Sequence, residues 1–103
     1  MTTDRSLIVV EDDSGFARTL KRSFERRGYE VVLAASIEEV RQVLEQRSFG
    51  HAVVDLKLGG ASGLACVELL HTHDPDMLIV VLTGFASIST AVEAIKLDRK
   101  SVV

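Results

Sequence analysis

Short apolar runs alternate along the chain with stretches in which apolar residues recur at helical spacing, and this alternation is its strongest large-scale pattern. Four runs have the length of strands, at residues 7–10, 29–33, 51–55 and 77–83. The first is apolar at every position, which is typical of a strand that is covered on both faces. The pattern therefore predicts four rounds of a strand followed by a helix.

Capping residues mark the ends of the first two of the four predicted helices. Ser36 and Glu39 form the Ser-x-x-Glu pattern that opens a helix. Arg26 and Arg27 put cations in the last turn of the first helix, and Gly28 stands where a left-handed cap is needed. The fourth helix is expected over residues 87–97. The positions expected to face the core are Phe16, Leu20, Phe24, Ile37, Val40, Val43, Leu44, Leu64, Val67, Leu69, Leu70, Ile88, Val92 and Ile95.

Alternation of this kind with short loops predicts an α/β fold, a doubly wound parallel sheet with helices on both faces. A chain of 103 residues with 47% hydrophobic and 26% charged residues has the balance of one small globular domain. In such a sheet, ligands bind at the carboxyl ends of the strands. We therefore expect a functional site at that edge.

The charge balance, the cysteine count and the short apolar runs argue against a nucleic-acid-binding, disulfide-bonded, secreted or membrane-spanning protein. Twelve Lys and Arg against fifteen Asp and Glu leave a formal charge of −3, so we expect no direct nucleic acid contact and no attraction to an acidic membrane. Cys66 is the single cysteine and cannot form an internal disulfide. Residues 1–5 are too few and too polar to begin a signal peptide, and residues 77–82, the longest apolar run, fall far below the roughly 20 residues of a membrane span. We expect a cytoplasmic protein.

Acidic residues gather at the predicted carboxyl edge of the sheet. Glu11, Asp12 and Asp13 directly follow the first strand, Asp55 ends the third, and Thr83 ends the fourth. Carboxylates packed together repel and raise one another's pKa unless water or a cation relieves the repulsion. All-oxygen ligands with open positions suit Mg²⁺. The cluster therefore predicts a Mg²⁺ site in which Asp55 is a nucleophile toward phosphorus and Thr83 donates its hydroxyl to a phosphoryl oxygen.

Each of these residues also has a purely structural interpretation. Asp55 alone could be a turn former or the N-cap of the next segment, and Thr83 alone could simply end a strand. Asp13 or Ser14 is expected to cap the first helix. The convergence of three strand ends favours the functional interpretation.

With these residues, the chain resembles the receiver domains of two-component response regulators over residues 7–97. Residues 8–13, Ile-Val-Val-Glu-Asp-Asp, are similar to the acidic turn after the family's first strand. Residues 53–55, Val-Val-Asp, resemble its phosphoacceptor strand, and residues 82–84, Leu-Thr-Gly, resemble its switch strand. Residues 82–97 also resemble the redox- and photosynthesis-responsive regulators, whose receiver precedes a small Fis-like helix-turn-helix. The resemblance implies the flavodoxin-like strand order 2-1-3-4, with a fifth strand beyond it.

The resemblance also implies a role for each site residue. Asp55 would be the phosphoacceptor and Asp12 the direct Mg²⁺ ligand, with Glu11 holding the metal through water. The backbone carbonyl of Lys57 would complete the metal site, and Thr83 would be the switch hydroxyl. A histidine kinase would pass its phosphoryl group to Asp55, and the new charge would change the surface that controls an output such as transcription, through a C-terminal DNA-binding domain. The domain would catalyse only its own phosphorylation and dephosphorylation, and is not expected to be an enzyme.

The chain departs from the family pattern in two places. Gly59 stands where the family commonly has proline, with a small expected effect. The family's phosphate-pairing lysine, at the end of a fifth strand, would fall past Val103, and neither Lys96 nor Lys100 replaces it.

We therefore expect an incomplete receiver domain over residues 1–97. The fifth βα unit would be missing, and residues 77–83 would be an exposed apolar edge. Residues 98–103 break the pattern, and one hypothesis is that they translate read-through into a sequencing adapter.

The alternative interpretation from another class is a Mg²⁺-dependent phosphohydrolase with an aspartyl nucleophile. Such enzymes usually need a second carboxylate two residues after the nucleophile as general acid, and Lys57 occupies that position. A flavin-binding domain would need a phosphate-cradling loop after the first strand, where three acids would repel phosphate. Both alternatives are therefore disfavoured.

Three further features have ordinary explanations. His71 and His73 resemble a metal pair but lack further His or Cys ligands. Cys66 is expected to be a small packed side chain, with redox sensing as the open alternative. The first helix is locally basic, which indicates a solvated face or a docking surface for a kinase; its cations are Arg18, Lys21, Arg22, Arg26 and Arg27.

Overall fold

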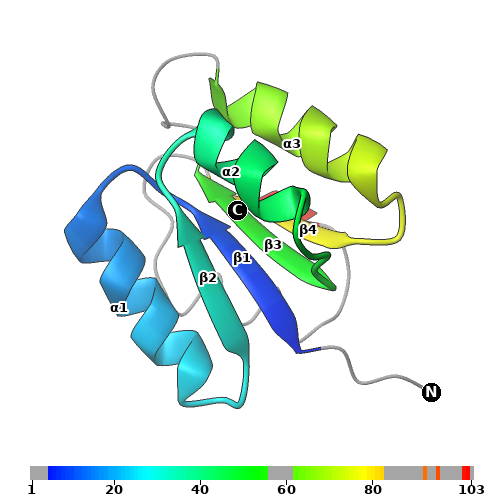
Figure 1. Cartoon of the computed structure of the whole chain (residues 1–103). Coiled ribbons are helices and arrows are strands. Elements are labelled where there is room, and N and C mark those ends of the chain that lie inside the picture. The colour runs from blue at the N-terminus through cyan, green and yellow to red at the C-terminus, as the bar shows by residue number, and fades with distance from the viewer. Residues whose placement is uncertain (1–4, 56–61, 83–91, 93–94, 96–100, 103) are drawn as a thin grey trace.

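The computed structural model describes residues 5–55, 62–82, 92, 95, 101 and 102, which form one parallel sheet with helices on both faces (Figure 1). The strands are β1 (Ser6–Val10), β2 (Glu30–Ala34), β3 (His51–Asp55), β4 (Leu78–Leu82) and β5 (Ser101–Val102), in the spatial order β2-β1-β3-β4-β5. The helices are α1 (Ser14–Glu25), α2 (Ile37–Leu44) and α3 (Ser62–His73). The predicted fold class, with strand order 2-1-3-4, is therefore confirmed.

The sheet separates two apolar clusters, because successive side chains of a strand point to opposite faces. Leu7 and Val9 of β1 pack on the α1 side, together with Phe24. Ile8 and Val10 pack on the opposite side, in the cluster that α2 and α3 cover. All five side chains are completely buried. Burial on both faces is why residues 7–10 of this strand are all apolar.

The helix ends follow the predicted capping chemistry. Gly28, after α1, has a φ of 89°, in the left-handed region that favours glycine. Ser36 Oγ accepts a hydrogen bond from the Glu39 N–H at 3.3 Å, and Glu39 Oε1 accepts one from the Ala35 N–H at 3.2 Å. Side chains thus satisfy backbone donors at the start of α2. Among the helices that the structure describes, none combines the length and the apolar character that crossing a bilayer requires.

The end of the chain differs from the expectation. Ser101 and Val102 form β5 and pair in parallel with Val80 and Val81, so a fifth strand is present, although it is short. All five residues of β4 are buried, and the prediction that this strand is an exposed apolar edge is wrong.

The predicted last helix, residues 87–97, lies mostly outside the described residues. Val92 and Ile95 are described; both are helical and buried on the α1 side.

Candidate functional site

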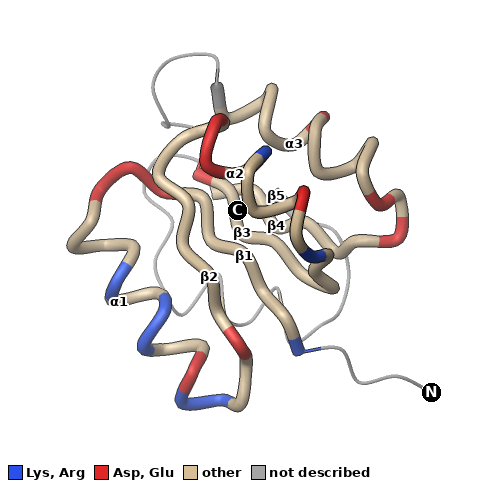
Figure 2. Tube along the Cα trace, viewed as in Figure 1, with Lys and Arg blue, Asp and Glu red and all other residues tan. Residues whose placement is uncertain are grey.

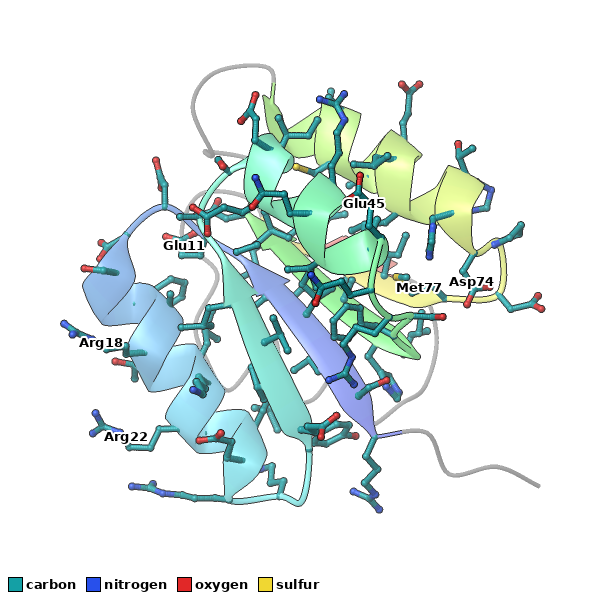
Figure 3. The ribbon with its side chains drawn as sticks, in the orientation of Figure 1. Glu11, Arg18, Arg22, Glu45, Asp74 and Met77 are labelled. Atoms are coloured by element: carbon teal, nitrogen blue, oxygen red, sulfur yellow. The ribbon has the colours of Figure 1, made fainter. Side chains whose placement is uncertain are left out.

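The parallel register brings the acidic residues after β1 and at the end of β3 to one edge of the sheet. Val10 lies beside Ala34 on one side and beside Val54 on the other. The Glu11 N–H continues the ladder by donating to the Ala34 carbonyl oxygen at 3.0 Å. Glu11 therefore stands next to Asp55, the residue that follows Val54. Figure 3 shows Glu11 at the carboxyl end of the strands, where the chain passes into α1.

Glu11 is a buried carboxyl group, with only 5% of its surface exposed. The pKa of Glu11 is raised to about 8, chiefly by burial and then by a side-chain hydrogen bond with Asp55 and by the charges of Asp55 and Asp12. A hydrogen bond with the Asp13 backbone lowers this pKa by a smaller amount. Within the described part of the chain, Glu11 Oε2 is buried without a hydrogen-bond partner. Two carboxyl groups in contact, one with an unsatisfied oxygen, are stable only when a proton or a cation sits between them.

The other two acids of the turn have different environments. Asp13 is the N-cap of α1, and its Oδ1 accepts hydrogen bonds from the N–H groups of Gly15 at 3.0 Å and Phe16 at 3.1 Å. The prediction that Asp13 or Ser14 caps this helix is therefore confirmed for Asp13. Asp12 is exposed to solvent. Its carboxylate is thus open to a ligand from outside, while that of Asp13 is occupied by the helix.

The described residues include three of the predicted metal ligands, Glu11, Asp12 and Asp55. Among these residues, no group of three or more His, Cys, Asp and Glu side chains could hold a metal ion. Mg²⁺ usually binds proteins through only one or two carboxylates and fills its other positions with water and phosphate oxygens. The Glu11–Asp55 contact beside the exposed Asp12 fits that donor set. Lys57 and Thr83, the other predicted site residues, lie outside the described residues.

The cysteine, the two histidines and the cations of the first helix have the environments of ordinary packed or solvent-exposed side chains. Cys66 is completely buried in the α2/α3 cluster, and burial raises the pKa of its thiol. His71 and His73 are both exposed on α3. Arg18 and Arg22 point away from the sheet on the outer side of α1 (Figure 3).

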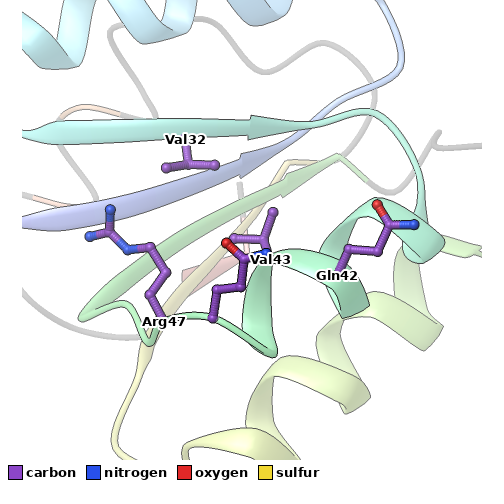
Figure 4. A pocket seen from close by; sticks show the side chains of 5 residues that line it. Val32, Gln42, Val43 and Arg47 are labelled. Atoms are coloured by element: carbon purple, nitrogen blue, oxygen red, sulfur yellow. The ribbon is translucent and has the colours of Figure 1, made fainter.

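One feature that sequence reasoning missed is a hollow of about 330 Å³ between β2 and α2. Two valines on adjacent elements, Val32 and Val43, lie on either side of it (Figure 4). At its end, Arg47 Nη2 lies 2.6 Å from Glu30 Oε1, and the guanidinium lies 4.6 Å from the centroid of the Phe49 ring. Periodicity identified Val43 as apolar and inward-facing but could not show that the side chain leaves a gap.

Comparison with known proteins agrees with this geometry. The model of the response regulator receiver domain family matches residues 7–103, beyond the boundary at residue 97 that the sequence suggested. The photosynthetic apparatus regulatory protein RegA of Cereibacter sphaeroides is 44% identical over 94 residues, which are 91% of this chain and 51% of that protein. The acid tolerance regulatory protein ActR of Sinorhizobium medicae is also 44% identical over 94 residues, 91% of this chain and 48% of that protein. The chain thus spans about half the length of these relatives.

A similar solved structure is a response regulator protein from Burkholderia pseudomallei with a phosphorylated aspartic acid, a calcium ion and citrate. It is 41% identical to this chain, with a TM-score of 0.77, and the match covers 96% of this chain and 58% of that one.

Proposed function

This chain belongs to the response regulator receiver domain family, and we propose that within it Asp55 accepts a phosphoryl group from a histidine kinase of a two-component system. The observation that carries the proposal is the contact between the buried Glu11 carboxyl group and Asp55 at the carboxyl edge of the sheet. Asp55 itself is half-buried, so that a phosphodonor can reach it. The similar Burkholderia protein contains a phosphorylated aspartic acid, which supports the same chemistry here.

The carboxylates around Asp55 fit a divalent cation, which we take to be Mg²⁺. Asp12 would bind it directly, Glu11 would hold it through water, and Asp55 and the backbone carbonyl of Lys57 would complete the site; the calcium ion in the Burkholderia protein supports a divalent ion. The unpartnered Glu11 Oε2 is an oxygen that a water bound to such an ion would satisfy. When bound, the ion supplies positive charge that offsets the repulsion between the carboxylates and the incoming phosphoryl oxygens.

The transfer itself requires little of the protein beyond positioning. A carboxylate oxygen of Asp55 attacks phosphorus, an O–P bond forms, and the P–N bond to the kinase histidine breaks with its electron pair leaving on nitrogen. The Thr83 hydroxyl donates a hydrogen bond to a phosphoryl oxygen and thereby couples the new charge to the surrounding surface. The chain catalyses only its own phosphorylation and dephosphorylation. Its product is a changed surface, which in the whole protein acts on a transcriptional output domain.

The test is intact mass spectrometry of the full chain after incubation with acetyl phosphate. With Mg²⁺, the wild type is expected to gain the mass of one phosphoryl group, and with EDTA to gain none. Asp55→Asn is expected to stay unmodified. The matched control, Asp76→Asn, changes an exposed aspartate that precedes β4 at the opposite edge of the sheet and is expected to label like the wild type. Labelling that persists in Asp55→Asn would refute the assignment, and repeated turnover of a phosphate ester would favour a phosphohydrolase.

A further inference from the structure

The outer edge of β2 presents unpaired backbone groups. Along a strand of a parallel sheet, the N–H and C=O groups of one residue point to the strand on one side, and those of the next residue point to the other side. The Glu30 N–H donates to the Arg5 carbonyl oxygen at 2.9 Å, toward β1. Val31 and Leu33 therefore direct their N–H and C=O groups outward, and no strand in the described part of the sheet lies on that side. An edge with such alternating donors and acceptors is completed by another extended strand.

An apolar hollow lies beside this edge. Its volume is about 330 Å³, and it opens between β2 and α2 (Figure 4). Val32, the central residue of β2, is only partly buried although it packs against the α2/α3 cluster. Gln42, Gln46 and Arg47 surround the two valines with polar groups. A strand added to β2 would place a side chain against Val32 and over this hollow.

The charges along the edge have opposite signs at its two ends (Figure 2). Acidic residues gather at the carboxyl end, where β1 passes into α1 and β2 passes into α2; they are Asp12, Asp13, Glu38 and Glu39. Cations outnumber acids at the amino end, where Arg5, Arg26, Arg27 and Arg47 accompany Glu25, Glu30 and Glu45. A partner strand with the same distribution of charge would match this edge only if it ran in the opposite direction.

We propose that this edge binds a second copy of the chain, with the two β2 strands antiparallel about a two-fold axis at Val32. Val31 then lies opposite Leu33 of the partner copy, and Leu33 lies opposite Val31 of the partner copy. Each pair exchanges two N–H···O=C hydrogen bonds. The two Val32 side chains meet at the axis, on the same face, and close the two hollows against each other. The acidic end of each copy faces the basic end of the other. This self-complementarity is what an isologous interface requires.

The test is sedimentation velocity of the full chain over a range of concentrations, with variants that separate the edge from the rest of the molecule. The wild type is expected to dimerise. Leu33→Pro removes an outward N–H and leaves the ladder to β1 intact, so it is expected to raise the dimer dissociation constant by about tenfold or more. The control is Glu68→Lys, an exposed change on α3, which is expected to dimerise like the wild type. Circular dichroism verifies that each variant is folded.

A disulfide tests the register directly. Val32→Cys places one thiol opposite its symmetry mate in the closest type of antiparallel pair, so mild oxidation is expected to produce a covalent dimer. Thr72→Cys, exposed on α3, is expected to remain monomeric under the same conditions. A wild type that is monomeric at every concentration would overturn the proposal and leave the edge to a strand from a different protein. A dimer that persists in Leu33→Pro, or that fails to form the Val32→Cys disulfide, would also overturn it.

Discussion

Replacing Glu11 with glutamine tests the electrostatics of the acidic site without any metal. In EDTA, the folded protein has a Glu11 pKa of about 8, raised from the ordinary value of 4.5 chiefly by burial and by the contact with Asp55. Between these two pH values the folded chain holds a proton at Glu11 that the unfolded chain has lost. The free energy of unfolding must therefore fall as the pH rises through this window.

The structure also sets the size of this effect. Each pKa unit is worth about 1.4 kcal/mol, so the full shift of Glu11 corresponds to about 4 to 5 kcal/mol. This is a large part of the roughly 5 to 15 kcal/mol that stabilises a typical domain. Glutamine is neutral at every pH and can donate to Asp55 as a protonated carboxyl group does. Glu11→Gln should therefore match the wild type at the acidic end of the window and be more stable at its alkaline end.

The assay is urea unfolding followed by far-UV circular dichroism, in EDTA, from about pH 5 to about pH 8. The wild type is expected to lose stability across this range, and Glu11→Gln is expected to lose much less. The control Glu68→Gln changes an exposed carboxylate on α3 and should keep the wild-type slope. Parallel pH profiles for the wild type and Glu11→Gln would refute the reasoning, because Glu11 would then not hold the additional proton.

Three further predictions concern the structure that supports the site. Asp13→Ala removes the acceptor for the Gly15 and Phe16 N–H groups and should lower the free energy of unfolding by about 1 kcal/mol, with Asp13→Asn restoring most of it; equal urea midpoints for all three proteins would contradict the capping role. Phe24→Ala empties a completely buried position of α1 and should cost about 3 to 5 kcal/mol in thermal or urea unfolding, whereas a loss below about 1 kcal/mol would contradict its packing. Cys66 should react with a thiol-specific chromogenic disulfide only after unfolding, since it is completely buried and burial raises the pKa of its thiol; rapid reaction of the native chain would show that the thiol is accessible.

Local patterns predicted most of the fold because they act over a few residues. The alternation of apolar runs with helical spacing identified the strands, and Ser36 and Gly28 marked helix ends through chemistry that needs only neighbouring residues. The two-residue strand β5 was not predicted, because Ser101 and Val102 are too few to show a period. Their assignment depends on pairing with Val80 and Val81, which no local pattern contains.

At the candidate site too, the sequence predicted what depends on strand order and missed what depends on packing. The sequence placed Glu11 and Asp55 at one edge of the sheet, and the register brings them into contact. It could not show that Glu11 would be buried while Asp12 stays exposed, because that depends on the bond from the Glu11 N–H to Ala34 and on the turn that Asp13 makes at the start of α1. The edge of β2 was missed for a related reason. Apolar periodicity predicted most of the residues that face the core, although Leu64, which it also assigned to the core, is 64% exposed. It does not show where two packed elements leave a gap.

The proposed function depends on Asp55 carrying the phosphoryl group, and the most decisive experiment is to locate the modification in the chain. The full chain is treated with acetyl phosphate and Mg²⁺ and then with borohydride, which reduces an acyl phosphate but not a phosphate ester. Peptide mapping is expected to find a reduced side chain at Asp55, and samples made in EDTA or from Asp55→Asn are expected to lack it. Reduction at Asp12 or Asp13 instead, or a borohydride-resistant phosphate on a serine or threonine, would show that Asp55 is not the phosphoacceptor.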